Sequence, residues 1–270
     1  MRLFELRKQL KEEFSSMDID SIDADFIISE VLNQPITMLP LIETIDDKDV
    51  QKVQKYAEKR KQHIPVNKIF KHTNFYGLDF KVNKFVLAPR QDSELLVDTA
   101  LKYIKENQFR TALDLCTGSG CLAIAIKKNI DIDITASDIS QQALNVAKFN
   151  ADKNHVKVNF VLSNMFENIQ DKFDIVITNP PYIATDDIDD LDEEVKNNDP
   201  ILALDGGELG LDYYNIIHDN LRKHLNDNGI IIMEIGEDQR IIIESLFNDF
   251  ELIEVVKDYN DVERVLVFKK

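Results

Sequence analysis

Residues 111–120 read TALDLCTGSG, a short apolar run that leads directly into a glycine-rich loop. The run has the length of a buried strand, and glycines allow a loop backbone to turn tightly and to approach a ligand closely. Ala123, Ile124 and Ile126 follow as the apolar positions of a helix. A strand, a glycine loop and the free N–H groups at a helix start, in this order, are typical of a nucleotide-like binding site.

Around this stretch, strands and helices alternate from residue 92 to the C-terminus. Strands are predicted at residues 111–116, 133–137, 156–162, 173–178, 229–235, 252–257 and 264–268. Besides the helix after the glycine loop, helices are predicted at residues 93–107, 143–154, 213–225 and 237–250. The alternation predicts an α/β fold with a mostly parallel, seven-stranded sheet and helices on both faces. The last two strands have no helix between them, so we expect a hairpin with one antiparallel member.

The N-terminal part of the chain has a different pattern, and residues 1–66 are predicted to form a helical domain. Apolar residues recur there at helical spacing in three segments. They are Leu3, Leu6, Leu10 and Phe14, then Ile22, Phe26, Ile27 and Leu32, and finally Val50, Val53, Tyr56 and Ala57. Residues 67–91 become aromatic and β-branched, with Gly77 at a turn, which predicts a β-hairpin linker to a domain at residues 92–270.

The overall composition narrows the class of protein. The formal net charge is −17, which lowers the expectation of a nucleic-acid partner and favours a basic one. No run of about 18 apolar residues spans a membrane, and the N-terminus lacks the apolar core of a signal peptide. Cys116 and Cys121 lie in one motif, and the five histidines have no metal-ligand spacing. We therefore expect a cytoplasmic monomer without a membrane partner, a disulfide framework or a metal.

The glycine loop and the next strand suggest a specific cofactor. The loop lacks the lysine of a phosphate-binding loop, so a nucleoside triphosphate is not expected. Asp138 stands 18 residues past Gly120 (138 − 120), where a carboxylate can accept hydrogen bonds from both ribose hydroxyls. A ribose without a phosphate fits S-adenosylmethionine, with Asp114 near the methionine ammonium group. The candidate loop residues are Asp114, Cys116, Thr117, Gly118, Ser119 and Gly120. The alternative is a tight turn with a helix cap.

Two further candidate cofactor residues end the third predicted strand of the sheet. Asn164 would bond the edge of an adenine, and Met165 would pack on its face. The alternative for Met165 is an ordinary core position.

A second motif, Asn179-Pro180-Pro181-Tyr182, follows the fourth predicted strand, FDIVIT. An amide nitrogen is a poor nucleophile because its lone pair is delocalised into the carbonyl. Two acceptors, the Asn179 side-chain oxygen and the Pro180 carbonyl, can hold an NH₂ group with its nitrogen facing a methyl donor. The prolines stiffen that geometry, and Tyr182 offers an aromatic wall. All four residues are candidate substrate residues. Asn179, Pro180 and Tyr182 are also the candidate catalytic residues, and Asn179 is expected to touch the cofactor as well. The alternative is an ordinary strand-ending turn.

With these motifs, the chain resembles the protein-(glutamine-N5) methyltransferases that modify peptide chain release factors, the HemK/PrmC family. Residues 87–94, LAPRQDSE, are similar to the family's Ile-Pro-Arg-Pro-x-Thr-Glu segment, and residues 179–182 match its Asn-Pro-Pro-Tyr. Residues 199–207, DPILALDGG, are similar to Glu-Pro-x-x-Ala-Leu-x-Gly-Gly, and residues 258–259 and 263–265 also fit. The resemblance covers essentially the whole chain.

The resemblance implies a Rossmann-like methyltransferase fold, with S-adenosylmethionine as donor and S-adenosylhomocysteine as product. It also implies that the substrate is the glutamine of a Gly-Gly-Gln motif in release factors, recognised by the N-terminal helical domain. The sequence departs from the family at four places. Cys116 replaces a glycine, Gln91 a proline and Asp199 a glutamate, and Asn164-Met165 replaces an acidic residue followed by an aromatic or small one.

Two other functions stay open from the residues alone. An adenine N6 amino-methyltransferase would use the same Asn179 device on a flipped base of nucleic acid. A non-enzymatic S-adenosylmethionine-binding module would have no need for the Asn-Pro-Pro-Tyr geometry. Residues 186–194, DDIDDLDEE, carry seven acidic side chains in nine positions. They form either a solvated loop or a strip that steers a basic substrate to the site.

Overall fold

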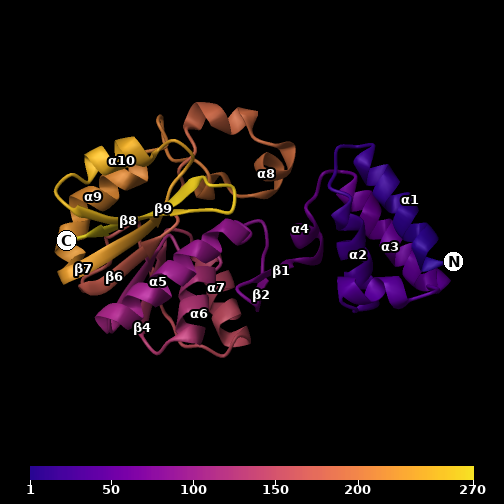
Figure 1. Ribbon diagram of the computed structural model, residues 1–270, viewed down its shortest axis with the longest axis horizontal. Coiled ribbons are helices and arrows are strands. Elements are labelled where there is room, and N and C mark those ends of the chain that lie inside the picture. The colour runs from indigo at the N-terminus through magenta and orange to yellow at the C-terminus, as the bar shows by residue number, and fades with distance from the viewer. The chain divides into compact units, whose positions relative to one another are not determined.

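The computed structural model describes residues 1–270, which form two compact units (Figure 1). The helical unit comprises residues 1–71 and 192–198, and the sheet unit comprises residues 72–191 and 199–270. The short segment 192–198 belongs to the helical unit although it lies in the middle of the sequence of the predicted α/β domain.

The sheet unit contains the predicted seven-stranded sheet. Its strands are β3 (Thr111–Leu115), β4 (Asp133–Asp138), β5 (Asn159–Leu162), β6 (Phe173–Thr178), β7 (Leu225–Glu234), β8 (Glu251–Lys257) and β9 (Glu263–Lys269). Their order is β5-β4-β3-β6-β7-β9-β8, and β9 is antiparallel to both of its neighbours. The chain runs outward from β3 through β4 to β5 and then returns to β6 on the other side of β3. This reversal opens a crevice at the carboxyl ends of β3 and β6, where ligands bind in such sheets.

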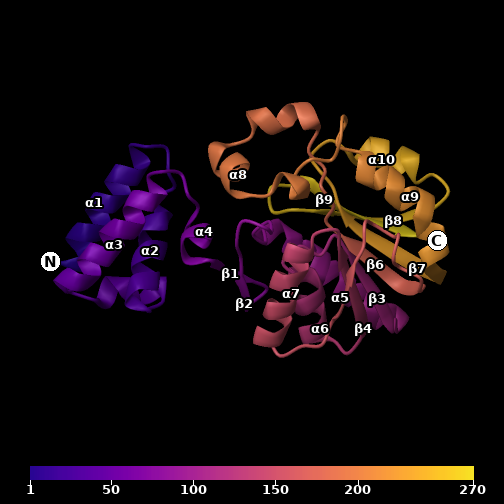
Figure 2. The same ribbon diagram turned by 180° about the vertical axis from the view of Figure 1, so that it is seen from behind.

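Helices cover both faces of the sheet, as predicted. They are α5 (Glu94–Asn107), α6 (Cys121–Asn129), α7 (Gln141–Lys153), α9 (Asp212–His224) and α10 (Arg240–Leu246). In Figures 1 and 2 the strands run between α5, α6 and α7 on one side and α9 and α10 on the other. On β6, Ile175 and Ile177 belong to the core cluster of α5 and α6, whereas Val176 belongs to the cluster of α9 and α10. Alternate strand residues thus fill two separate cores.

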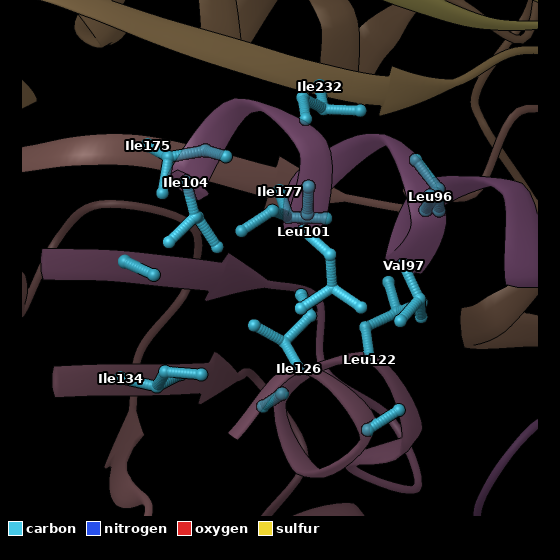
Figure 3. Close-up of a cluster of buried hydrophobic side chains, with 14 of the residues drawn as sticks. Leu96, Val97, Leu101, Ile104, Leu122, Ile126, Ile134, Ile175, Ile177 and Ile232 are labelled. Atoms are coloured by element: carbon cyan, nitrogen blue, oxygen red, sulfur yellow. The ribbon is translucent and has the colours of Figure 1, made fainter. Parts of the chain in front are cut away.

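Figure 3 shows the first core at close range. Leu96, Leu101 and Ile104 of α5 lie over the strand residues Ile175 and Ile177. These side chains are spaced as the apolar face of a helix requires, and all of them are at least 93% buried (Leu101, with 7% exposed, is the most accessible). The packing fixes β3 and β6, and therefore the edge of the sheet from which the site residues project.

The helical unit is built on α1 (Leu3–Ser15), α2 (Ile22–Leu32) and α3 (Asp47–Arg60), with α4 (Val66–Phe70) after them. The predicted apolar positions of α1 are all buried, but Ile22 and Phe26 of α2 are exposed. The buried face of α2 instead follows Ala24, Ile27 and Ile28, whose i, i+3, i+4 spacing places Ile22 and Phe26 on a different side of the helix. The short helix α8 (Glu193–Asn198), which the sequence did not predict, also belongs here, and the Glu194 carboxylate pairs with Arg60.

The predicted hairpin is present as β1 (His72–Phe75) and β2 (Leu78–Lys81), within the sheet unit. Tyr76 and Gly77 both have positive φ, as a two-residue hairpin turn of this twist requires.

Two elements differ in length from their predictions. The strand β7 begins four residues before Gly229, and the helix α10 spans only seven residues. No helix of the protein combines the length and apolar character needed to cross a membrane.

Candidate active site

A cavity of about 250 Å³ lies at the carboxyl ends of β3, β4 and β6 in the sheet unit. Its wall includes the glycine loop after β3, the turn after β4 and the turn after β5. Asn179 and Pro181 after β6 also line it, as do residues 85–90 and Ser93 before α5. The structure therefore brings the predicted cofactor residues other than Asp114 and Gly120, and part of the predicted catalytic motif, to a single cavity.

The glycine loop is held by backbone hydrogen bonds. The Thr117 N–H donates to the Ser137 carbonyl of β4 at 2.9 Å, and the Gly120 N–H donates to the Thr117 carbonyl at 2.8 Å. Gly120 has φ +82°, and a Cβ there would lie 3.0 Å from the Cβ of Ala147. Glycine is needed at this position both for its left-handed backbone and for the close approach of α7.

Asp138 lines the cavity at the end of β4. One carboxylate oxygen accepts from the Gly118 N–H at 2.8 Å, and the other accepts from the Ser140 N–H at 2.8 Å. Burial raises the pKa of Asp138, while these backbone bonds act in the opposite direction. Each oxygen keeps a further lone pair, so the carboxylate can still accept from two ribose hydroxyls.

Asp114 is buried beneath the loop and does not line the cavity, so its predicted place near the methionine ammonium group stays a prediction. Its Oδ2 accepts from the Thr117 hydroxyl at 2.6 Å and from the Ala123 N–H at 3.2 Å. Burial raises the pKa of Asp114 to about 7. Its Oδ1, together with the hydroxyl oxygens of Ser119 and Ser137, is buried without a hydrogen-bond partner.

These three polar atoms without partners surround the glycine loop, and Ser119 and Ser137 line the cavity. Buried polar atoms usually have partners, so an unpaired group here fits a polar ligand. Together with Asp138 and the absence of a lysine from the loop, they fit a nucleoside with a charged amino-acid tail. S-adenosylmethionine has this chemistry.

Cys116 and Met165 are two of the positions at which the sequence differs from the motifs of the family it resembles. Both line the cavity and both have left-handed backbones, with φ of 64° and 47°. Their sulfur atoms lie 3.7 Å apart. Burial raises the pKa of the Cys116 thiol and raises that of Cys121 to about 12, which disfavours the thiolate form of both. Asn164 also lines the cavity, and its side-chain amide donates to Glu167 at 2.9 Å.

The side-chain amide nitrogen of Asn179 is directed to Ser93. This nitrogen, Nδ2, donates to the Ser93 hydroxyl oxygen at 3.1 Å, and the Ser93 hydroxyl donates to Glu234 Oε2 at 2.6 Å. The amide oxygen of Asn179 is then the end that can accept from a substrate. Pro180 and Pro181 are buried, and of the two only Pro181 lines the cavity.

Tyr182 is half-buried and packs beside the second core cluster rather than lining the cavity. Its carbonyl accepts from the Gln239 side-chain amide at 3.0 Å, and burial raises the pKa of its hydroxyl to about 12. Tyr182 is thus held against the protein core, and its role as an aromatic wall for the substrate stays a prediction.

The segment DPILALDGG lies directly against the catalytic motif. The Ile183 N–H donates to the Leu204 carbonyl at 3.0 Å, and the Gly206 N–H donates to the Ile183 carbonyl at 2.7 Å. A Cβ on Gly210 would lie only 2.3 Å from the Tyr182 carbonyl oxygen. The glycines after this segment therefore allow two loops to lie backbone to backbone.

Sequence reasoning missed two residues of the site, Ser93 and Glu234. Glu234 lies within the otherwise apolar run GIIIMEIG, and a single acidic residue in such a run was the available indication. Ser93 lies in the segment 87–94 that resembles the family's linker motif, but no role was predicted for Ser93 itself. Arg90 lies at the cavity wall and donates to the carboxylate of Asp199 at 2.9 Å, so the linker and the DPILALDGG segment are joined there.

Comparison with known proteins identifies the class of protein. Residues 91–211 match the methyltransferase small domain family. The fold is similar to that of a methyltransferase from Pyrococcus furiosus, with a TM-score of 0.56 and 16% identity, covering 79% of this chain and 98% of that one. The sheet, the cavity and the domain match define an S-adenosylmethionine-dependent methyltransferase.

The particular family follows from relatives that match almost the whole chain. A release factor glutamine methyltransferase from Agrobacterium fabrum is 39% identical, covering 92% of this chain and 90% of its own. Another from Thermodesulfovibrio yellowstonii is 35% identical, covering 97% of both chains. The chain belongs to the release factor glutamine methyltransferase family.

Proposed function

We propose that this enzyme methylates the side-chain amide nitrogen, N5, of the glutamine in the Gly-Gly-Gln motif of peptide chain release factors. Its relatives are named for action on release factor glutamine. The observation that carries the proposal is the orientation of Asn179, whose amide nitrogen is bound to Ser93 at the wall of the cofactor cavity.

The chemistry requires an amide to act as a nucleophile without losing its proton first. The Asn179 oxygen and the Pro180 carbonyl accept from the two N–H groups of the glutamine side chain, and this turns the nitrogen lone pair toward the cavity. The bound donor supplies an electrophilic methyl group and leaves as S-adenosylhomocysteine. The new N–C bond forms as the C–S bond breaks, and the nitrogen then releases one proton to water.

The protein contributes mainly alignment to this reaction. Pro180 and Pro181 each have their own φ fixed by the proline ring. The backbone hydrogen bond between Gly206 and Ile183 holds the chain directly after the motif. Because alignment lowers the barrier to methyl transfer, the mechanism needs no acid–base group before that step.

The adenine amino-methyltransferase function uses the same Asn179 geometry, but two observations disfavour it. The family assignment rests on relatives named for glutamine, and the net charge of −17 opposes a nucleic-acid substrate.

We propose that the predicted helical domain, residues 1–66, recognises the release factor. Phe4 and Leu41 of this domain are 71% and 73% exposed, and apolar side chains exposed in this way suit a protein partner. The hairpin linker at 67–91 and the catalytic domain at 92–270 complete the proposed division. A cytoplasmic monomer without a nucleic-acid partner is part of the same proposal.

The test is to incubate the purified enzyme with S-adenosylmethionine and an unmodified release factor, and to map methylated peptides by mass spectrometry. Asn179→Ala and a duplex DNA sample run beside it. A gain of one methyl on the Gly-Gly-Gln glutamine, lost in the variant, supports the proposal. Methylated adenine in DNA with unmodified protein would establish the alternative instead.

A further inference from the structure

Glu234 is a buried acidic side chain that the chemistry above does not use. It lies at the end of β7 and is 6% exposed, and it has no ion-pair partner. Its Oε2 accepts from the Ser93 hydroxyl at 2.6 Å, and Ser93 itself is 3% exposed. Burying a carboxylate costs free energy unless hydrogen bonds or an opposite charge compensate, so the partners of Glu234 need a physical explanation.

Donation along the hydrogen bonds runs in one direction, from Asn179 to Ser93 and from Ser93 to Glu234. An ionised carboxylate only accepts, so the single hydrogen of the Ser93 hydroxyl is committed to Glu234. Toward Asn179 the hydroxyl oxygen can then only accept, which requires the NH₂ end of the Asn179 amide at 3.1 Å. The two ends of an asparagine amide have nearly the same shape, so hydrogen-bond polarity is what selects between them.

We propose that Glu234, acting through Ser93, is a positioning residue that fixes the orientation of the Asn179 amide and presents its oxygen to the substrate. The inference rests on the proposed function, because it assigns a purpose to the orientation that the proposed reaction needs. Glu234 ends β7, Ser93 precedes α5 and Asn179 follows β6, with sequence separations of 141 and 86 residues along the chain of bonds.

The charge state of Glu234 gives the inference a pH dependence. Burial raises the pKa of Glu234 to about 7, against the Ser93 hydrogen bond, the nearby Asn179 amide and the charge of Arg264. Asp92 raises it further. The other titratable groups facing Glu234 are Tyr182, Tyr214, whose hydroxyl donates to the Glu234 backbone carbonyl at 2.8 Å, and Cys121.

Protonation reverses the direction of the bonds. A protonated Glu234 can donate to Ser93, whose hydroxyl is then free to donate to the oxygen of a flipped Asn179 amide. The competent orientation therefore belongs to the ionised form, which dominates above the pKa. We expect kcat to be full above about pH 7 and to fall as the pH falls through that value.

The decisive variant is Glu234→Gln, which keeps the size of the side chain and removes its charge. We expect kcat on the release factor to fall by about tenfold to a hundredfold, the scale of a misaligned reacting group. The Kd for S-adenosylmethionine, measured by calorimetry, should stay within about threefold, and the acidic limb of the kcat–pH profile should disappear. Glu237→Gln, an exposed carboxylate three residues away, is the matched control and should change none of these.

Two further variants separate the possible failures. Asn179→Ala that remains fully active would overturn the proposed function itself. Asn179→Ala that is inactive, beside Glu234→Gln with normal kcat and an unchanged acidic limb, would overturn only the positioning role. Ser93→Ala removes the relaying hydroxyl and leaves the carboxylate, so it tests the same expectation if Glu234→Gln does not fold. A normal kcat and acidic limb in Ser93→Ala would also overturn the inference.

Discussion

The two ends of the cavity are held in different ways. At the cofactor end, the glycine loop bonds to near neighbours, such as Asp114 with Thr117, and to the next strand, β4, through Thr117 with Ser137 and Gly118 with Asp138. At the substrate end, Asn179 is bonded to Ser93 and Ser93 to Glu234, with sequence separations of 86 and 141 residues. The cofactor end is therefore built within one strand–loop–helix–strand unit, and the substrate end is assembled from parts of the fold that are distant in sequence.

Because of this difference, we expect the two ends of the cavity to tolerate different substitutions. The cofactor end contains Cys116 and Met165 in place of the usual residues of the family and still forms the cavity. At the substrate end the backbones of two loops meet so closely that Gly210 has no room for a side chain. Substitutions should therefore act on cofactor affinity at one end and on turnover or folding at the other.

The sharpest way to separate the two ends is Asn179→Ala. Removing the acceptor should lower kcat by about 10²–10³-fold, the scale measured for loss of one transition-state hydrogen bond. The Kd for S-adenosylmethionine should change by less than about threefold, because the cofactor end keeps its own contacts. Single-turnover methylation and calorimetry measure the two quantities. An equal loss of cofactor affinity would show that the two ends are not independent.

The close approach of the loops can be broken with Gly210→Ala. The new Cβ would lie 2.3 Å from the Tyr182 carbonyl oxygen, and φ is +68°. We expect the free energy of unfolding to fall by about 2–4 kcal/mol, with loss of activity. Gly77→Ala is the matched control, because its φ is +70° but nothing lies within 4 Å of the new Cβ. Equal losses in both variants, measured by urea denaturation, would mean that backbone strain alone accounts for the effect.

The cofactor end is tested by Asp138→Asn. The change replaces one carboxylate oxygen by a donor, so Gly118 or Ser140 loses its acceptor and the ribose loses a charged partner. A charge-assisted hydrogen bond contributes about 1.5–3 kcal/mol, so the Kd for S-adenosylmethionine should rise by roughly tenfold to a hundredfold. At saturating donor, kcat should be nearly normal. A large loss of kcat at saturation would assign Asp138 a role beyond binding.

The same contrast explains what the sequence could predict. The glycine loop, the strands of the sheet and Asp138 follow from local patterns of about 20 residues, and the structure confirms the sheet and its antiparallel member. Ser93 and Glu234 acquire their roles only when α5, β6 and β7 meet, which no local pattern encodes. The exposure of Ile22 and Phe26 was missed because one helix carries two overlapping apolar spacings, and packing selected the one through Ala24, Ile27 and Ile28.

A smaller effect is expected from Cys116→Gly. Cys116 has φ 64°, and a non-glycine residue in this region costs about 1–2 kcal/mol, while glycine adds entropy to the unfolded chain. These contributions oppose each other, so the free energy of unfolding should change by less than about 1 kcal/mol. Thermal denaturation and cofactor calorimetry measure the outcome. A loss well above this would indicate that the sulfur contact with Met165 stabilises the loop.

The smallest expected effect comes from the acidic residues after the catalytic motif. Asp186, Asp187, Asp190 and Glu193 are exposed, whereas Glu194 pairs with Arg60 and is best left unchanged. Neutralising the four exposed acids to amides should lower kcat/KM for the release factor a few-fold at low salt, because long-range steering is lost. Near 0.5 M salt the variant and the parent should be equal, since screening then removes the attraction in both. An unchanged salt dependence would show that these residues only solvate the loop, and that neither end of the cavity draws its substrate by charge.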